Sequence, residues 1–160
     1  MSKPLKIYVA SSWRNKYQPD VVTLLRGAGY EVYDFRNPAP DDDGFRWSEI
    51  DPNWKSWTVE QYAAALNHPV AKRGFDYDFK ALISADLCVL VLPSGRSASW
   101  EYGYHGGMTL RSGIVHMPEP CEPELMYRGS TFTDTHEKLL AAVAVYAEEY
   151  GLREKCRYGS

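Results

Sequence analysis

The most constraining feature of this chain is an apolar run over residues 87–92 that leads into a glycine-containing segment. Six consecutive apolar residues are typical of a strand buried on both faces of a parallel sheet. A turn at Ser94 and Gly95 follows, and the helix predicted after it holds three glycines, which cost roughly 3 kcal/mol of helix propensity relative to alanine. We therefore expect another group to approach this helix closely. Ligands of open α/β sheets bind beyond the carboxyl ends of strands, which puts Glu101 in a predicted ligand crevice.

Apolar strands and amphipathic helices alternate along the whole chain. Strands are predicted over residues 5–10, 30–35, 87–92 and 113–117, with a short fifth strand over residues 125–128. Besides the helix that holds Glu101, helices are predicted over residues 17–28, 58–67, 74–84 and 139–150, the last stopped by Gly151. With right-handed crossovers, this alternation predicts a flavodoxin-like α/β fold, a doubly wound five-stranded parallel sheet of order 2-1-3-4-5, in one domain over residues 1–160.

A long irregular segment over residues 36–56 interrupts the alternation. It holds three prolines, an acidic run, and the two tryptophans Trp47 and Trp54. Loops of this length in compact domains are often lids or binding segments, so the tryptophans are candidates to cover a ligand or a subunit partner. The alternative is a surface loop whose tryptophans pack onto the core. The sequence favours neither.

Composition restricts the classes of partner and cofactor. The 160 residues carry a formal net charge of -3, whereas proteins that bind nucleic acid polymers usually present a basic surface. Small molecules are therefore the expected partners. Three widely spaced cysteines (Cys88, Cys121 and Cys156) predict neither a disulfide framework nor a zinc site. We expect no metal and no cofactor, and, because no apolar stretch has the length of a membrane span, a cytoplasmic location.

Glu101 has two interpretations when its helix is considered alone. A carboxylate in the first turn of a helix is favoured by the helix dipole, and a capping box places Glu three residues after Ser or Thr. Here Ala98 stands three residues before Glu101, so the capping box is excluded. Stabilisation by the dipole and a catalytic role in the crevice remain.

Several segments together resemble one enzyme family. Glu101-Tyr-Gly-Tyr-His-Gly-Gly follows the strand and Ser-Gly turn described above, residues 6–12 form the opening strand and loop, and residues 78–86 precede the third strand. In this order they resemble the nucleoside 2-deoxyribosyltransferase family, which includes the deoxynucleoside 5'-monophosphate N-glycosidases. The resemblance implies that Glu101 is the nucleophile, that Asp78 is an acid in contact with the base, and that the protein is a homo-oligomer.

The same resemblance, together with the topology, supplies candidate substrate-binding residues. It implies that Tyr8 of the first strand lies near the sugar, while Asp76 is a second candidate acid two residues before Asp78. The alternative interpretation of both acids is that they stabilise the first turn of their helix through the helix dipole. For Tyr8 the alternative is a strand aromatic in the core.

The turn after the first strand and the turn before Glu101 belong to the same predicted crevice. The first turn contributes Ser11, Trp13 and Arg14, where Trp13 is a candidate to stack on a base and Arg14 either meets a phosphate or is solvated. The second contributes four residues: Ser94, Gly95, Arg96 and Ser97. Hydroxyls and an arginine at a helix N-terminus favour a 5'-phosphate, and the alternative is ordinary capping with Arg96 solvated.

We therefore expect cleavage of an N-glycosidic bond, or exchange of the base, on a nucleoside or its 5'-monophosphate through a glycosyl-enzyme on Glu101. Two alternatives stay open. One is a noncatalytic nucleotide-binding module that keeps the crevice. The other is a glycohydrolase that acts on a larger nucleotide such as NAD.

Overall fold

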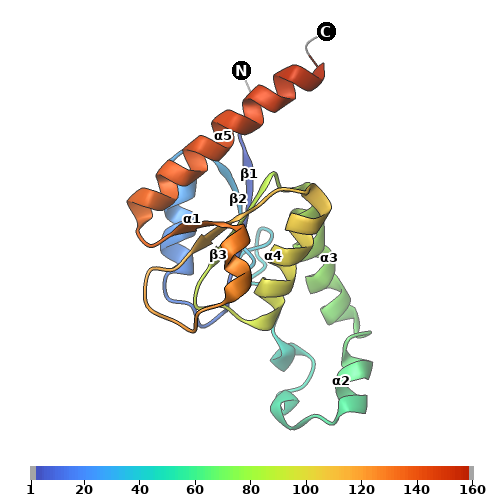
Figure 1. Ribbon diagram of the computed structural model, residues 1–160. Coiled ribbons are helices and arrows are strands. Elements are labelled where there is room, and N and C mark those ends of the chain that lie inside the picture. The colour runs from blue at the N-terminus through green and yellow to red at the C-terminus, as the bar shows by residue number, and fades with distance from the viewer. Residues whose placement is uncertain (1–2, 159–160) are drawn as a thin grey trace.

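A five-stranded parallel sheet forms the centre of the molecule (Figure 1). The computed structural model describes residues 3–158, with side chains as far as residue 151. The strand order is β2-β1-β3-β4-β5, so the predicted flavodoxin-like order 2-1-3-4-5 is confirmed. The strands are β1 (Lys6–Ala10), β2 (Glu31–Tyr33), β3 (Leu87–Val91), β4 (Ile114–His116) and β5 (Thr131–Thr133).

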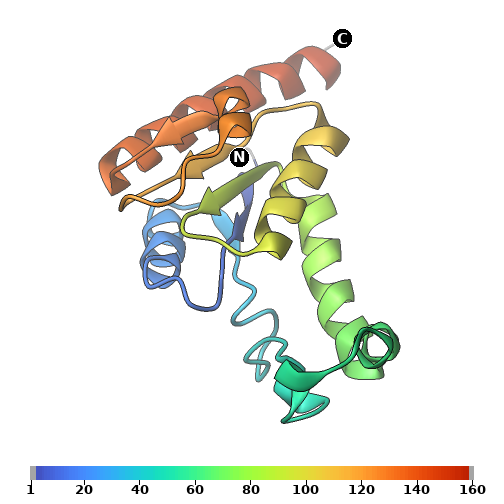
Figure 2. The same cartoon turned by 60° about the horizontal axis from the view of Figure 1, so that its bottom comes forward.

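Helices cover both faces of the sheet (Figures 1 and 2). They are α1 (Gln18–Gly27), α2 (Val59–Ala65), α3 (Pro69–Ser84), α4 (Arg96–Thr109) and α5 (His136–Tyr158), with short 3-10 turns η1 (Trp47–Glu49), η2 (Trp54–Ser56) and η3 (Leu125–Gly129). Side chains alternate along each strand, so Ile7 and Val9 pack with α1 and α5, whereas Tyr8 and Ala10 pack with α3 and α4. The α3 and α4 face therefore receives the side chain of Tyr8.

Three predicted element boundaries are wrong. Residues 125–128 form η3, and the fifth strand follows at β5. Helix α3 begins at Pro69 instead of residue 74, because His68 caps its N-terminus through Nδ1 and proline suits the first helical position. Helix α5 continues beyond Gly151 to Tyr158, since one glycine costs only about 1 kcal/mol within a long helix.

The glycines of α4 do not receive the close approach that we expected from them. A Cβ atom at Gly103 or Gly107 would meet nothing within 4 Å, and at Gly106 the nearest atom is the Arg111 carbonyl oxygen at 3.5 Å. Gly113, before β4, is different: a Cβ atom there would lie 2.6 Å from the Cys88 carbonyl oxygen. Close packing between described residues thus explains why a glycine is needed at position 113. It does not explain the glycines of α4.

The segment between β2 and α2 and the helix α2 itself extend away from the sheet, beside the N-terminal half of α3 (Figures 1 and 2). Arg36 fixes the start of this segment by donating hydrogen bonds to the carbonyl oxygens of Ser12, Trp13 and Asn15. It thereby ties the loop after β2 to the loop after β1, at the carboxyl end of the sheet.

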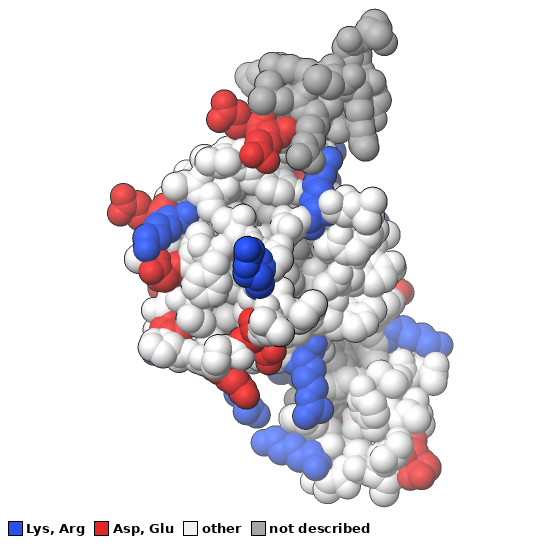
Figure 3. Space-filling model, in the orientation of Figure 1, with Lys and Arg blue, Asp and Glu red and all other residues white. Residues whose placement is uncertain are grey.

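Acidic and basic side chains are both present on the face shown in Figure 3, and several basic side chains lie near one another in its lower part. Within the described part of the chain, no helix has the length and apolar character needed to cross a membrane.

Candidate active site

Two stacked tyrosines of the sheet contact the carboxyls of the candidate site without lining its cavity. Tyr8 and Tyr33 are partners in the register of β1 and β2, and their ring centroids lie 5.3 Å apart with an angle of 16° between the planes. The Tyr33 hydroxyl donates a 2.8 Å hydrogen bond to Oδ1 of Asp78. The Tyr8 hydroxyl bonds to the carboxyl of Glu101. Each carboxyl is therefore held by one tyrosine of the sheet.

The two carboxyls come from the two helices that cover this face. Asp78 lies in the middle of α3, and Glu101 lies in the second turn of α4. Neither belongs to a first turn, so the interpretation of these acids as first-turn partners of a helix dipole is wrong. Their positions instead follow from contact with Tyr8 and Tyr33 on the sheet.

Burial changes the protonation of both carboxyls. It raises the pKa of Glu101 to about 8, with the negative charge of Asp78 as the second cause and the Tyr8 hydrogen bond opposing them. Burial also raises the pKa of Asp78 to about 6, against the hydrogen bond from Tyr33 and with a further rise from the charge of Asp42. Between about pH 6 and pH 8 the pair therefore holds one proton.

A cavity of about 550 Å³ opens in front of the two carboxyls, within the range of roughly 300–1,000 Å³ that is usual for small-molecule sites. Arg96 and Ser97, at the start of α4, line it together with Asp78 and Glu101. The other lining residues are Phe45, Trp47, Tyr62, Leu66, Ala71, Gly74, Phe75, Phe79, Leu82 and Trp100. The cavity thus combines two acids and one cation with a largely apolar wall.

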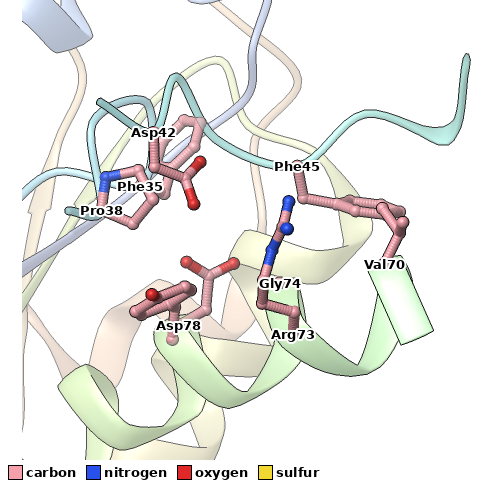
Figure 4. Close-up of a pocket in the computed structure, with 9 residues that line it drawn as sticks. Phe35, Pro38, Asp42, Phe45, Val70, Arg73, Gly74 and Asp78 are labelled. Carbon is pink, nitrogen blue, oxygen red and sulfur yellow. The ribbon is translucent and has the colours of Figure 1, made fainter. Parts of the chain in front are cut away.

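The loop after β2 approaches the same acid from another side. In a small pocket beside Asp78, the carboxylates of Asp42 and Asp78 point toward one another and the Arg73 guanidinium lies beside them (Figure 4). Because Asp42 raises the pKa of Asp78, this loop influences how readily Asp78 holds a proton at neutral pH. Sequence reasoning did not identify Asp42.

The loop after β1 contacts the end of β3 and the loop after β2. The Ser11 hydroxyl donates to the Val91 carbonyl oxygen at 2.8 Å, and the buried Asn15 amide bonds the same oxygen at 3.2 Å. Trp13 packs edge-on against Phe35, and Arg14 is exposed. None of the predicted residues Ser11, Trp13 and Arg14 lines the cavity that holds Glu101.

Some of the remaining predicted residues line the cavity, and the others do not. Arg96 and Ser97 line the cavity, Gly95 precedes the first residue of α4, and the Ser94 side chain bonds to Tyr127. Asp76 is exposed and lines a separate surface depression with Lys72 and Lys80. The structure therefore brings Asp78, but not Asp76, to Glu101.

The long loop contributes one of its two candidate tryptophans. Trp47 lines the cavity, whereas Trp54 does not. Sequence reasoning missed Tyr33 and the aromatic residues of α3 and α4. Tyr33 ends a strand adjacent to β1 at the carboxyl edge of the sheet, and this position was the available signal for it.

No protein-family model and no curated protein sequence matches this chain. A similar solved structure is a 2-deoxyribosyltransferase from the psychrotolerant bacterium Bacillus psychrosaccharolyticus. The alignment covers 84% of this chain and 89% of that chain, with 18% sequence identity and a TM-score of 0.52. This chain has the fold of that transferase. At this identity the likeness establishes the fold, and the chemistry has to be argued from the residues of the cavity.

Removal of the Tyr33 hydroxyl gives a test of its contact with Asp78. This hydrogen bond lowers the pKa of Asp78, so Tyr33→Phe is expected to raise that pKa. Because ionisation of the pair begins at Asp78, the first ionisation of the pair, followed by NMR of the side-chain carboxyl carbons, should move to higher pH. Tyr30→Phe is the matched control, since Tyr30 packs on the opposite face of the sheet. An unchanged first ionisation in Tyr33→Phe would contradict this assignment.

Proposed function

We propose that this protein cleaves the N-glycosidic bond of a 2'-deoxynucleoside or its 5'-monophosphate and passes the sugar to water or to a second base. The observation that carries the proposal is the pair of part-buried carboxyls, each bonded to one of two stacked tyrosines, in a cavity large enough for a nucleotide. The resemblance of the sequence to the nucleoside 2-deoxyribosyltransferase family and the fold shared with a 2-deoxyribosyltransferase support the same reaction class.

The two carboxyls have different roles in the proposed reaction. A carboxylate oxygen of Glu101 bonds to C1' of the sugar as the bond from C1' to the base nitrogen breaks. The electron pair of the broken bond stays on the base, which takes the proton of Asp78. Water or a second base then attacks C1' and releases Glu101, and Asp78 receives the proton of that nucleophile. Water gives hydrolysis, and a base gives transfer.

The pair holds the single proton that this division of roles requires. The reactive form has Glu101 ionised and Asp78 protonated. It is the less populated of the two arrangements, because the pKa values place the proton mainly on Glu101 between about pH 6 and pH 8. The Tyr8 hydroxyl stabilises negative charge on Glu101, and the Tyr33 hydroxyl occupies only one oxygen of Asp78. The other Asp78 oxygen is then available to carry the proton to the base.

The start of α4 supports recognition of a 5'-phosphate. Arg96 and Ser97 line the cavity at the N-terminus of the helix that carries Glu101, where backbone amides and the helix dipole favour an anion. The guanidinium of Arg96 suits a phosphate because it offers several hydrogen-bond donors in one plane. We extend the proposal, on the family resemblance, to a single-domain enzyme that works as a homo-oligomer in the cytoplasm.

Release of free base tests the proposed function. The protein is incubated with 2'-deoxynucleosides, ribonucleosides, their 5'-monophosphates and NAD, and the products are separated by chromatography. We expect free base from the 2'-deoxy substrates, faster from the monophosphates. Tight binding of these compounds without release of base would support a noncatalytic nucleotide-binding module. Release of nicotinamide alone would support a glycohydrolase that acts on larger nucleotides such as NAD.

A further inference from the structure

Two groups of aromatic side chains supply much of the wall of the cavity that holds the two carboxyls. The first, called here the loop group, contains Phe45, Trp47, Trp57 and Tyr62. The second, called here the helix group, contains Phe75, Phe79, Trp100 and Tyr104. Three members of each group line the cavity that also holds Asp78 and Glu101. Two independent parts of the chain thus bring aromatic rings to one site.

The rings within each group support one another in fixed orientations. Trp47 lies at the centre of the loop group, with its ring centroid 4.7 Å from that of Phe45 and 5.7 Å from that of Tyr62. In the helix group, Trp100 stacks on Tyr104 with centroids 5.0 Å apart. Such contacts hold aromatic rings at the distances and angles that aromatic pairs prefer. The two groups are therefore preformed surfaces on which a flat molecule can stack.

The polar content of the cavity is unevenly distributed. Its charged groups and its one aliphatic hydroxyl come from four side chains: Asp78, Glu101, Arg96 and Ser97. The other lining residues are aromatic or aliphatic, and their only polar groups are the indole N–H groups and the phenol hydroxyl. An unsubstituted nucleobase presents hydrogen-bonding groups at the edge away from the sugar. Such groups lose their bonds to water against an apolar wall, which costs binding free energy.

The same wall leaves much aromatic surface in contact with water. Phe75 is 55% exposed and Trp100 is 53% exposed, and both line the cavity. Covering such rings with an apolar group is favourable, because the hydrophobic effect scales with the apolar area removed from water. The wall thus matches a ligand that carries an apolar group in addition to the parts that meet the carboxyls.

We propose that the leaving base of the substrate carries a bulky apolar substituent, preferably an aromatic ring, that lies between the loop group and the helix group. This inference rests on the proposed function, because it assigns the sugar to Glu101 and the base to Asp78. It adds a class of substrate: bases that are enlarged at the edge away from the sugar.

A matched pair of substrates tests the inference. The 5'-monophosphates of 2'-deoxyadenosine and of 2'-deoxyadenosine benzylated on the exocyclic amine differ only in the apolar ring. We expect kcat/KM to be on the order of tenfold to a hundredfold higher for the benzylated substrate, from contacts of the added ring alone. Equal or lower kcat/KM for the benzylated substrate would overturn the inference and leave the proposed function in place.

Two tryptophans of the same loop provide a variant and its control. Trp47→Ala removes the centre of the loop group, so the preference for the benzylated substrate should fall to about threefold or less, with a smaller change for the unsubstituted one. Trp54→Ala changes a tryptophan that lies outside the cavity and should keep the preference. A preference that survives Trp47→Ala, or that is lost equally in Trp54→Ala, would overturn the assignment of the ring to this wall.

A binding measurement separates this inference from the proposed function. N6-benzyladenine is titrated into the protein while tryptophan fluorescence is followed, with adenine as the comparison. Tighter binding of N6-benzyladenine with no release of base from any nucleotide would support the aromatic site and contradict the proposed function. If neither compound binds, and Phe75→Glu converts an oligomer to a monomer, the wall is an interface between copies of the chain and the inference is overturned.

Discussion

Glu101→Gln is expected to reduce the rate of base release by a factor on the order of 10⁴ or more. The amide keeps the size of the carboxyl but lacks a charged oxygen that can bond to C1', and loss of a nucleophile has effects of this size in other enzymes. The measurement is chromatography of free base after single turnovers with enzyme in excess. The matched control is Glu148→Gln, an exposed residue of α5, which should release base at the wild-type rate.

The fold of Glu101→Gln can be checked by its thermal stability. The pKa of Glu101 is raised in the folded protein, so the folded state binds more protons than the unfolded chain between about pH 4.5 and pH 8. The wild type therefore loses stability as pH rises through this window, and glutamine does not carry this penalty. At pH 8 the variant should melt at the same temperature as the wild type or higher. If such a well-folded variant released base at the wild-type rate, the proposed mechanism would be wrong.

Asp78→Asn is expected to lower kcat/KM by about 10²-fold to 10⁴-fold and to change the shape of the pH profile. The wild type should be most active between about pH 6 and pH 8, where the pair of carboxyls holds one proton. Asparagine has no proton to lose, so the fall in activity at alkaline pH should disappear. Its neutral side chain also removes a cause of the raised pKa of Glu101, so the remaining ionisation should occur below pH 8.

Two comparisons make this prediction specific to proton donation. Asp76→Asn, two residues earlier and outside the cavity, should keep the wild-type profile. A base methylated on N7 of guanine carries a positive charge and leaves without a proton, so Asp78→Asn should lose little activity on 7-methyl-2'-deoxyguanosine 5'-monophosphate. A loss as large as that seen with 2'-deoxyguanosine 5'-monophosphate would show that Asp78 does not act by protonating the base.

The fold was predictable because the strongest sequence signals are also the central elements. Residues 87–91 of the apolar run form β3 in the middle of the sheet, where both faces are buried and only apolar residues fit. The edges were harder. The sequence predicts the fifth strand in the residues before β5, because three residues of an edge strand carry little periodicity. The start of α3 was placed too late, since His68-Pro69 signals the end of one helix and the beginning of the next equally well.

The site was predictable only in part, because its residues meet through the sheet and not along the sequence. Glu101 is predicted from the local pattern and from resemblance, and Asp78 from resemblance alone. Their partners Tyr8 and Tyr33 become recognisable as a pair only in the register of β1 and β2. The aromatic wall needs the loop, α2, α3 and α4 together, and no spacing in the sequence relates Trp47 to Trp100.

The central claim, that Glu101 becomes bonded to the sugar, is tested most directly by trapping the intermediate. A 2'-deoxy-2'-fluoro nucleotide has an electronegative fluorine that destabilises the positively charged transition state, so the glycosyl-enzyme turns over slowly and accumulates. Mass spectrometry of intact protein should show an added fluorosugar phosphate, and peptide mapping should place it on Glu101, with no adduct in Glu101→Gln. Release of base without an adduct, or an adduct on another residue, would contradict the claim.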